Sequence, residues 1–138
     1  MALLVPNQAE ERMIQMIVNA TTNQNLNQVL RLYKNNLTPA STDVLADYTE
    51  ATFTGYSSVT LTSGSWTITP GAPTSAAQTS ATTFACTATT SELIYGYYLA
   101  QASATVMQWA ERFSDGPYTI ANNGDKIILT VQLTLSTT

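Results

Sequence analysis

The chain has 138 residues and a net charge of −4, and only 10% of its residues are charged. Threonine and serine, with 24 and 11 residues, replace the missing charge, and this composition favours a β-rich structural or binding protein. The sequence contains no histidine, which excludes a Ser-His-Asp or Cys-His catalytic set, and its five basic residues give no positive patch for nucleic acid. We therefore expect a single domain over residues 1–138 with no catalytic residue, cofactor, metal, nucleic-acid partner or membrane span.

The first predicted element is a short amphipathic helix over about residues 8–20. Asn7 is a capping residue, and Glu10 follows it three residues later as in a capping box. Apolar residues then recur at helical spacing, and three of them are candidates for contact with a partner: Met13, Met16 and Ile17. This stripe is expected either to cover one end of the β-structure or to dock on another chain.

From about residue 28 onward, the apolar period changes from 3.6 to 2, which indicates strands. We expect them in the stretches 29–35, 58–62, 66–69, 81–88, 92–99, 106–113, 118–121 and 126–135. The turn residues 122–125 (NNGD) predict a hairpin between the last two stretches. Residues 72–83 fit either a strand or a loop, and 105–113 fits a short helix as the less favoured alternative. About seven or eight such strands indicate an antiparallel β-sandwich or small barrel over about residues 28–136.

The stretch 106–113 carries polar residues inside an apolar run. In a strand, Glu111 shares a face with Trp109 and Arg112 points to the other face. Two interpretations remain open for Glu111 and Arg112. They form a pair that faces a subunit or partner, or a partly exposed ion pair that fixes the strand edge.

Aromatic residues gather in the C-terminal half. Strand alternation places Tyr95 and Tyr97 on one face and Tyr98 on the other, so these rings and Trp109 do not all line one groove. We therefore favour a core or subunit contact over a sugar-stacking platform, with Tyr97 and Trp109 as contact candidates.

Five segments follow the helix in a fixed order: LRLYKNNLTPASTDVLADYTEATFTGY (30–56), SWTI (65–68), LIYGYYLAQ (93–101), VMQWAERF (106–113) and GDKIILTVQLTL (124–135). With this order the chain resembles the small structural proteins that decorate, or cement, the heads of tailed bacteriophages. The resemblance implies a virion protein that assembles in the host cytoplasm and binds the outer surface of the shell of major capsid protein. It also implies a homo-oligomer, with a trimer favoured over a dimer.

Two other functions stay open at this point. One is a receptor-binding module of the tail or fibre that recognises a surface glycan through tyrosine and tryptophan. The other is a glycan hydrolase, which needs two carboxylates about 5 to 9 Å apart, and no pair of acids in the sequence is marked for that role. Asp43 and Asp47 also lack the dense ligand spacing of a calcium loop.

Overall fold

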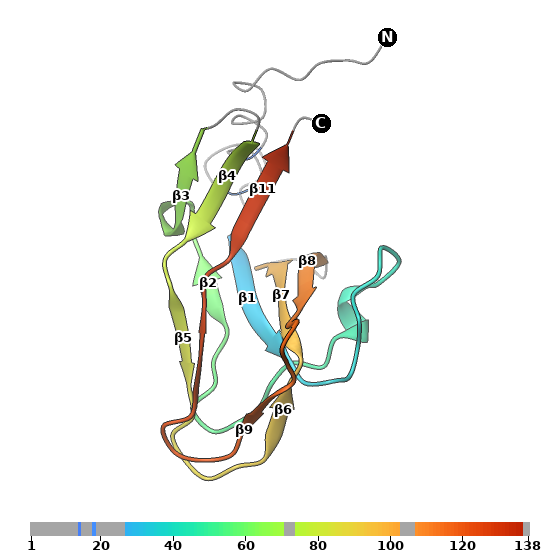
Figure 1. Ribbon diagram of the computed structural model, residues 1–138, viewed down its shortest axis with the longest axis vertical. Coiled ribbons are helices and arrows are strands. Elements are labelled where there is room, and N and C mark those ends of the chain that lie inside the picture. Colours follow the sequence, from blue (N-terminus) through green and yellow to red (C-terminus); the bar gives the residue numbers. More distant parts are fainter. Residues whose placement is uncertain (1–13, 15–17, 19–26, 71–73, 103–106, 137–138) are drawn as a thin grey trace. The chain divides into compact units, whose positions relative to one another are not determined.

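The structure, a computed structural model, describes residues 14, 18, 27–70, 74–102 and 107–136 (Figure 1). These residues fold mainly as antiparallel β-structure, with eleven strands and two short 3-10 helices, η1 (Leu45–Asp47) and η2 (Ser63–Ser65). The expected β-rich class is confirmed, whereas the expected number of strands is too low. By their contacts the residues form two compact units, which are described one at a time below.

The first unit contains a three-stranded sheet in the order β11 (Gln132–Ser136), β4 (Thr74–Thr79) and β3 (Trp66–Thr69). The central strand β4 lies in the stretch that the sequence left open between strand and loop. Its side chains at 75, 77 and 79, which project from one face of the sheet, are buried. The Thr79 hydroxyl accepts a hydrogen bond from the Val131 amide at 3.1 Å, whereas the buried Ser75 hydroxyl makes no hydrogen bond to the described residues.

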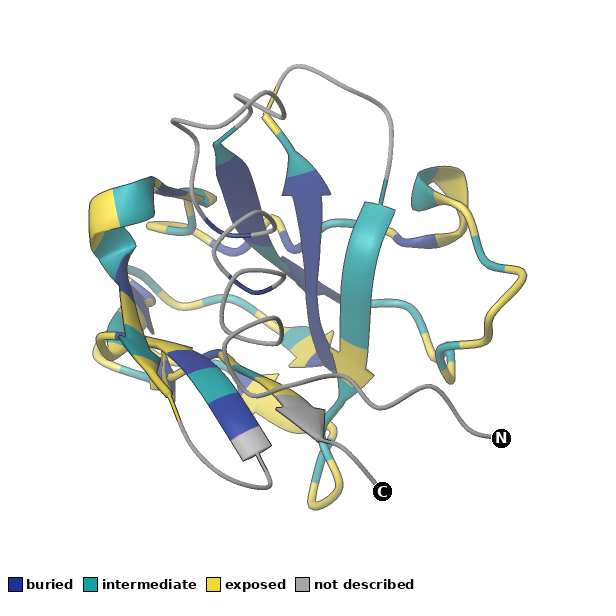
Figure 2. Cartoon of the chain, turned by 90° about the horizontal axis from the view of Figure 1, so that it is seen from above, coloured by how far each residue is buried: buried dark blue, intermediate teal, exposed yellow. Residues whose placement is uncertain are grey.

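The second unit contains a four-stranded sheet in the order β2 (Val59–Leu61), β1 (Gln28–Tyr33), β7 (Gly96–Gln101) and β8 (Met107–Arg112). The inner strands β1 and β7 are buried along almost their whole length, while β8 is only half-buried (Figure 2). Residues 107–112 are therefore a strand, and the helical alternative for 105–113 is wrong for the residues described.

Two smaller sheets complete the second unit. β6 (Glu92–Ile94) pairs with β9 (Tyr118–Ile120), and β10 (Lys126–Leu129) pairs with β5 (Thr82–Ala85). The hairpin predicted between β9 and β10 is therefore wrong, although the turn between them exists. The long strand predicted over 126–135 is also divided, since Thr130 and Val131 separate β10 from β11.

Tyr95 separates β6 from β7, so the predicted strand over 92–99 forms parts of two sheets. Its ring packs against the cluster that contains Tyr98, whereas the Tyr97 ring lies 6.2 Å from that of Phe113. The expectation that Tyr95 and Tyr97 share a face is therefore wrong, because the break at Tyr95 interrupts the strand alternation on which it rested.

The predicted helix over 8–20 lies almost wholly outside the described residues. Only Ile14 and Val18 of that stretch are described, and both are buried. The contact candidates Met13, Met16 and Ile17 lie outside the described residues, and their role stays a prediction.

Candidate functional site

β8 is the outer strand of its sheet, and an open groove runs along it. We call it the β8 groove; its volume is about 370 Å³. Four consecutive residues of β8 line it, and the register with β7 shifts among them, because Leu99 pairs with Trp109 and Ala100 with Met107. The groove therefore follows the edge of β8 at an irregularity of the strand. The remaining wall is the loop 39–48. The lining residues are Pro39, Ala40, Ser41, Asp43, Tyr48, Met107, Gln108, Trp109 and Ala110.

The segment leading into that loop is held in place at Leu37. Its carbonyl oxygen accepts hydrogen bonds from the Arg112 guanidinium at 2.8 Å and from the Tyr33 hydroxyl at 3.3 Å. Arg112 also donates to the Asn36 side chain at 2.8 Å and stacks on the Tyr95 ring. Arg112 therefore fastens the segment that precedes the groove wall to the end of β8.

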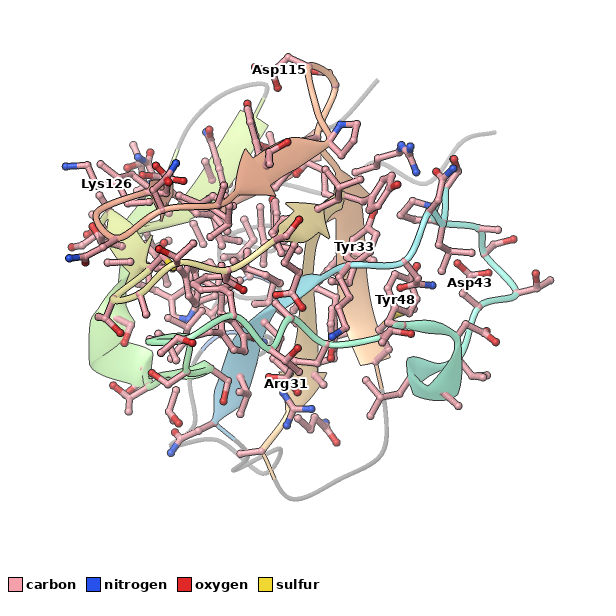
Figure 3. All side chains as sticks on the ribbon, turned by 90° about the horizontal axis from the view of Figure 1, so that it is seen from below. Arg31, Tyr33, Asp43, Tyr48, Asp115 and Lys126 are labelled. Carbon is pink, nitrogen blue, oxygen red and sulfur yellow. The ribbon has the colours of Figure 1, made fainter. Side chains whose placement is uncertain are left out.

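Asp43 and Tyr48 fix the wall itself (Figure 3). The Asp43 carboxylate accepts hydrogen bonds from the Ala40 amide at 2.9 Å and from the Tyr48 hydroxyl at 2.8 Å. The Tyr48 ring packs edge-on against Tyr33 and tilted against Tyr98. Burial, and then the hydrogen bond to Asp43, raise the pKa of Tyr48, so its hydroxyl stays a donor at neutral pH.

Inside the groove, apolar and hydrogen-bonding groups lie side by side. Trp109 and Met107 are half-buried, so part of each side chain is available to a ligand. The side-chain oxygen of Gln108 is buried and makes no hydrogen bond to the described residues. A groove with both apolar surface and hydrogen-bonding groups can bind an extended peptide or a flat ring that carries hydrogen-bond donors. The groove contains no pair of side chains that could act as general acid and general base.

The structure separates the four predicted candidates of the C-terminal half. Trp109 lines the β8 groove, and Arg112 supports the segment before its wall. Tyr97 is 6% exposed and donates a hydrogen bond to Glu111, with which it is in register across β7 and β8. Burial, and then Glu111, raise the pKa of Tyr97. Tyr97 and Glu111 therefore form a structural pair outside the lining of the groove.

The described carboxylates are all engaged in hydrogen bonds within the chain. Two of them cap turns: Asp47 accepts the Val44 amide, and Asp125 accepts the Ala121 and Asn122 amides. The other carboxylates interact with side-chain donors: Asp43, Glu50, Glu92, Glu111 and Asp115. Asp43 and Glu92 also accept hydrogen bonds from backbone amides. In the described part of the chain, no cluster of acidic or thiol side chains could hold a metal ion. In that part, no helix is long and apolar enough to cross a membrane.

Comparisons of the chain with protein-family models, with curated proteins and with solved structures found no match. The function therefore has to be argued from the chain's own residues.

Sequence reasoning missed eight of the nine residues that line the β8 groove, among them Asp43, Tyr48, Met107 and Gln108. No local pattern marks them, because the groove exists only where the loop 39–48 meets the outer edge of a strand 60 residues later. Only Trp109 was found from the sequence, because it is an aromatic residue in an apolar stretch that also carries charged residues.

The anchoring role of Arg112 predicts a stability loss on substitution. Arg112→Lys removes the planar fork that reaches Leu37 and Asn36 together, so we expect the free energy of unfolding to fall by about 1 kcal/mol. Urea unfolding measures this change. Val44→Ala in the same loop is the control, since that side chain is 58% exposed and its removal should change stability by less than about 0.5 kcal/mol. Equal losses in both variants would contradict the anchoring role.

Proposed function

We propose that the chain is a β-sandwich decoration protein of a phage head, which binds the outer surface of the shell of major capsid protein and stabilises it. The observation that carries the proposal is the β8 groove, in which the edge of β8 has no partner strand among the described residues and lies beside the loop 39–48. An unpaired strand edge presents backbone donors and acceptors that pair with an extended segment of another protein.

The proposed mechanism is adhesion without catalysis. A shell segment pairs with the edge of β8, and Trp109 and Met107 anchor it by burying their exposed surface, as aromatic residues do at the centres of interfaces. Micromolar binding needs about −8 kcal/mol, which one short strand barely supplies after ordering costs. Binding as a homo-oligomer, with a trimer favoured, joins several weak contacts into one strong attachment.

Sedimentation with tail-less heads tests this proposal. The wild-type chain should saturate the heads at hundreds of copies per particle, and Trp109→Ala should weaken this binding at least tenfold, because it removes the largest anchor in the groove. Leu93→Ala is the matched control, since Leu93 is an exposed apolar residue that does not line the groove. Failure of the wild-type chain to sediment with heads would overturn the proposal.

A second candidate, a glycan-binding module of the tail, is supported by the same groove. A half-buried tryptophan stacks on a sugar ring, and the Asp43 carboxylate at the groove wall accepts hydroxyl hydrogen bonds. Titration with host surface polysaccharide separates the two functions. A glycan-binding module binds the polysaccharide and loses this binding on Trp109→Ala, whereas a decoration protein shows no saturable glycan binding.

A further inference from the structure

Asp43 is the only charged residue that lines the β8 groove. Its carboxylate accepts the Ala40 amide and the Tyr48 hydroxyl on the same oxygen, Oδ2 (Figure 3). The other oxygen, Oδ1, makes no hydrogen bond to the described residues and is not a buried atom. The groove therefore presents a fixed negative charge with one carboxylate oxygen open to a ligand.

No cation of the described residues forms an ion pair with Asp43, since both ion pairs found there join other residues. The loop 39–48 has no basic residue and carries a second carboxylate, Asp47. The strand β8 adds one acid, Glu111, and one base, Arg112, whose guanidinium donates to the segment before the loop. The loop and the strand together thus carry an excess of two negative charges, which is complementary to a positively charged ligand.

The two sides of the β8 edge differ in chemistry. Ala110 packs against the tyrosine cluster that contains Tyr48, and Tyr48 in turn holds Asp43, so the carboxylate belongs to this side. Trp109 and Ala110 are in regular register with β7, so the Trp109 side chain projects to the opposite side. In a strand added along this edge, neighbouring residues alternate between the side of Asp43 and the side of Trp109.

We infer that the β8 groove binds an extended segment of the partner protein in which a lysine or arginine stands next to an apolar residue. The basic side chain pairs with Oδ1 of Asp43, and the apolar side chain packs on Trp109. This inference rests on the proposed binding of a shell segment at β8, and it adds the sequence pattern that the segment carries. Backbone pairing is the same for every sequence, whereas a charged contact selects one partner and one register.

Sedimentation with tail-less heads at two salt concentrations tests the inference on the assembled particle. Asp43→Asn keeps a side-chain oxygen for Ala40 and Tyr48 and removes the charge, so it should weaken binding about tenfold in low salt. In about 1 M salt the Debye length falls to about 3 Å, and the loss should shrink to below about threefold.

Asp47→Asn is the matched control for this experiment. It removes the same charge from the same loop, but Asp47 does not line the groove, and asparagine can still accept the Val44 amide. It should change binding by less than about twofold at either salt concentration. Equal losses in Asp43→Asn and Asp47→Asn, or unchanged binding of Asp43→Asn, overturn the inference even though the wild-type chain binds heads.

A peptide experiment separates failure of the inference from failure of the proposed function. The probe is an eight-residue peptide in which threonine and valine alternate and one central threonine is replaced by lysine. Added to the full chain, it should shift the backbone amide resonances of residues 40–48 and 107–110. The same peptide with glutamate in place of lysine should bind about tenfold more weakly, because repulsion replaces attraction at Asp43.

The Asp43→Asn chain should lose most of this preference and distinguish the two peptides by less than about threefold. Equal binding of both peptides to the wild-type chain, absence of binding, or shifts confined to other residues overturns the inference. A chain that prefers the lysine peptide and yet fails to sediment with heads supports the inference and overturns only the proposed function.

Discussion

Gly96→Ala is expected to lower the free energy of unfolding by about 3 kcal/mol or more, which is a large part of the stability of a small domain. A Cβ atom at Gly96 would lie 2.1 Å from the Glu111 carbonyl oxygen and 2.6 Å from the Tyr33 ring. The carbonyl belongs to the backbone of β8, and Tyr33 is fully buried, so neither has room to move away. Urea unfolding of the variant measures the loss.

Gly64→Ala is the matched control for this prediction. A Cβ at Gly64 would come no closer than 3.8 Å to another atom, so the substitution is free of overlap. Both substitutions reduce the entropy of the unfolded chain equally, and Gly64→Ala should therefore be neutral or stabilise by up to about 1 kcal/mol. A Gly96→Ala variant as stable as Gly64→Ala would contradict the packing argument.

The same close approach explains why the segment before the β8 groove is ordered. Tyr33, Gly96 and Arg112 occupy one row across β1, β7 and β8, so the Tyr33 ring covers the glycine. From this position the Tyr33 hydroxyl and the Arg112 guanidinium both reach the carbonyl of Leu37. The absent side chain at 96 thus allows the aromatic packing that holds the neighbouring loop.

The local pattern of the sequence predicts most strands because each depends on its own residues. Alternation in 58–62 and 66–69 was enough to locate β2 and β3, and the strand-like run 106–113 located β8. It could not assign partners, because pairing depends on contacts that are distant in sequence. The turn at 122–125 has the residues of a hairpin, yet hydrogen bonds to Cys86 direct β10 to β5.

The candidate site was less predictable than the strands. Trp109 was found because an aromatic residue beside charged ones is conspicuous in a strand. No sequence pattern marks Asp43 or Gln108 as a contact residue. They line the groove because the loop that carries Asp43 lies beside the edge of β8, which carries Gln108. Tyr97 and Glu111, which the sequence grouped with Trp109, are in register with each other across two strands and hydrogen-bond there.

The second substitution with a large expected effect on the free energy of unfolding is at Glu92. Its carboxylate accepts hydrogen bonds from the Lys34 ammonium at 2.9 Å, from the Thr52 amide at 2.9 Å and from the Phe53 amide at 2.8 Å. The Thr52 hydroxyl donates to it as well. Glu92→Gln places an amide group among these donors, so we expect the free energy of unfolding to fall by about 3 kcal/mol at neutral pH. Asp115→Asn is the control, since Asp115 is exposed and forms no ion pair among the described residues.

The pH dependence of the Glu92→Gln effect follows from the pKa of Glu92. Burial alone would raise this pKa, but the hydrogen bonds from Lys34, Thr52 and Phe53 outweigh burial and lower it. A carboxyl group with a lowered pKa in the folded state stabilises the fold fully above its unfolded pKa of about 4.5, and this contribution is lost as the pH falls through the folded value. The wild-type chain should therefore be more stable than Glu92→Gln by the same free energy at pH 6 and pH 7, to within about 0.3 kcal/mol. This difference should shrink below about pH 4.5. Urea unfolding at several pH values measures it, and a difference that stays constant down to pH 3 would contradict the role given to the Glu92 carboxylate.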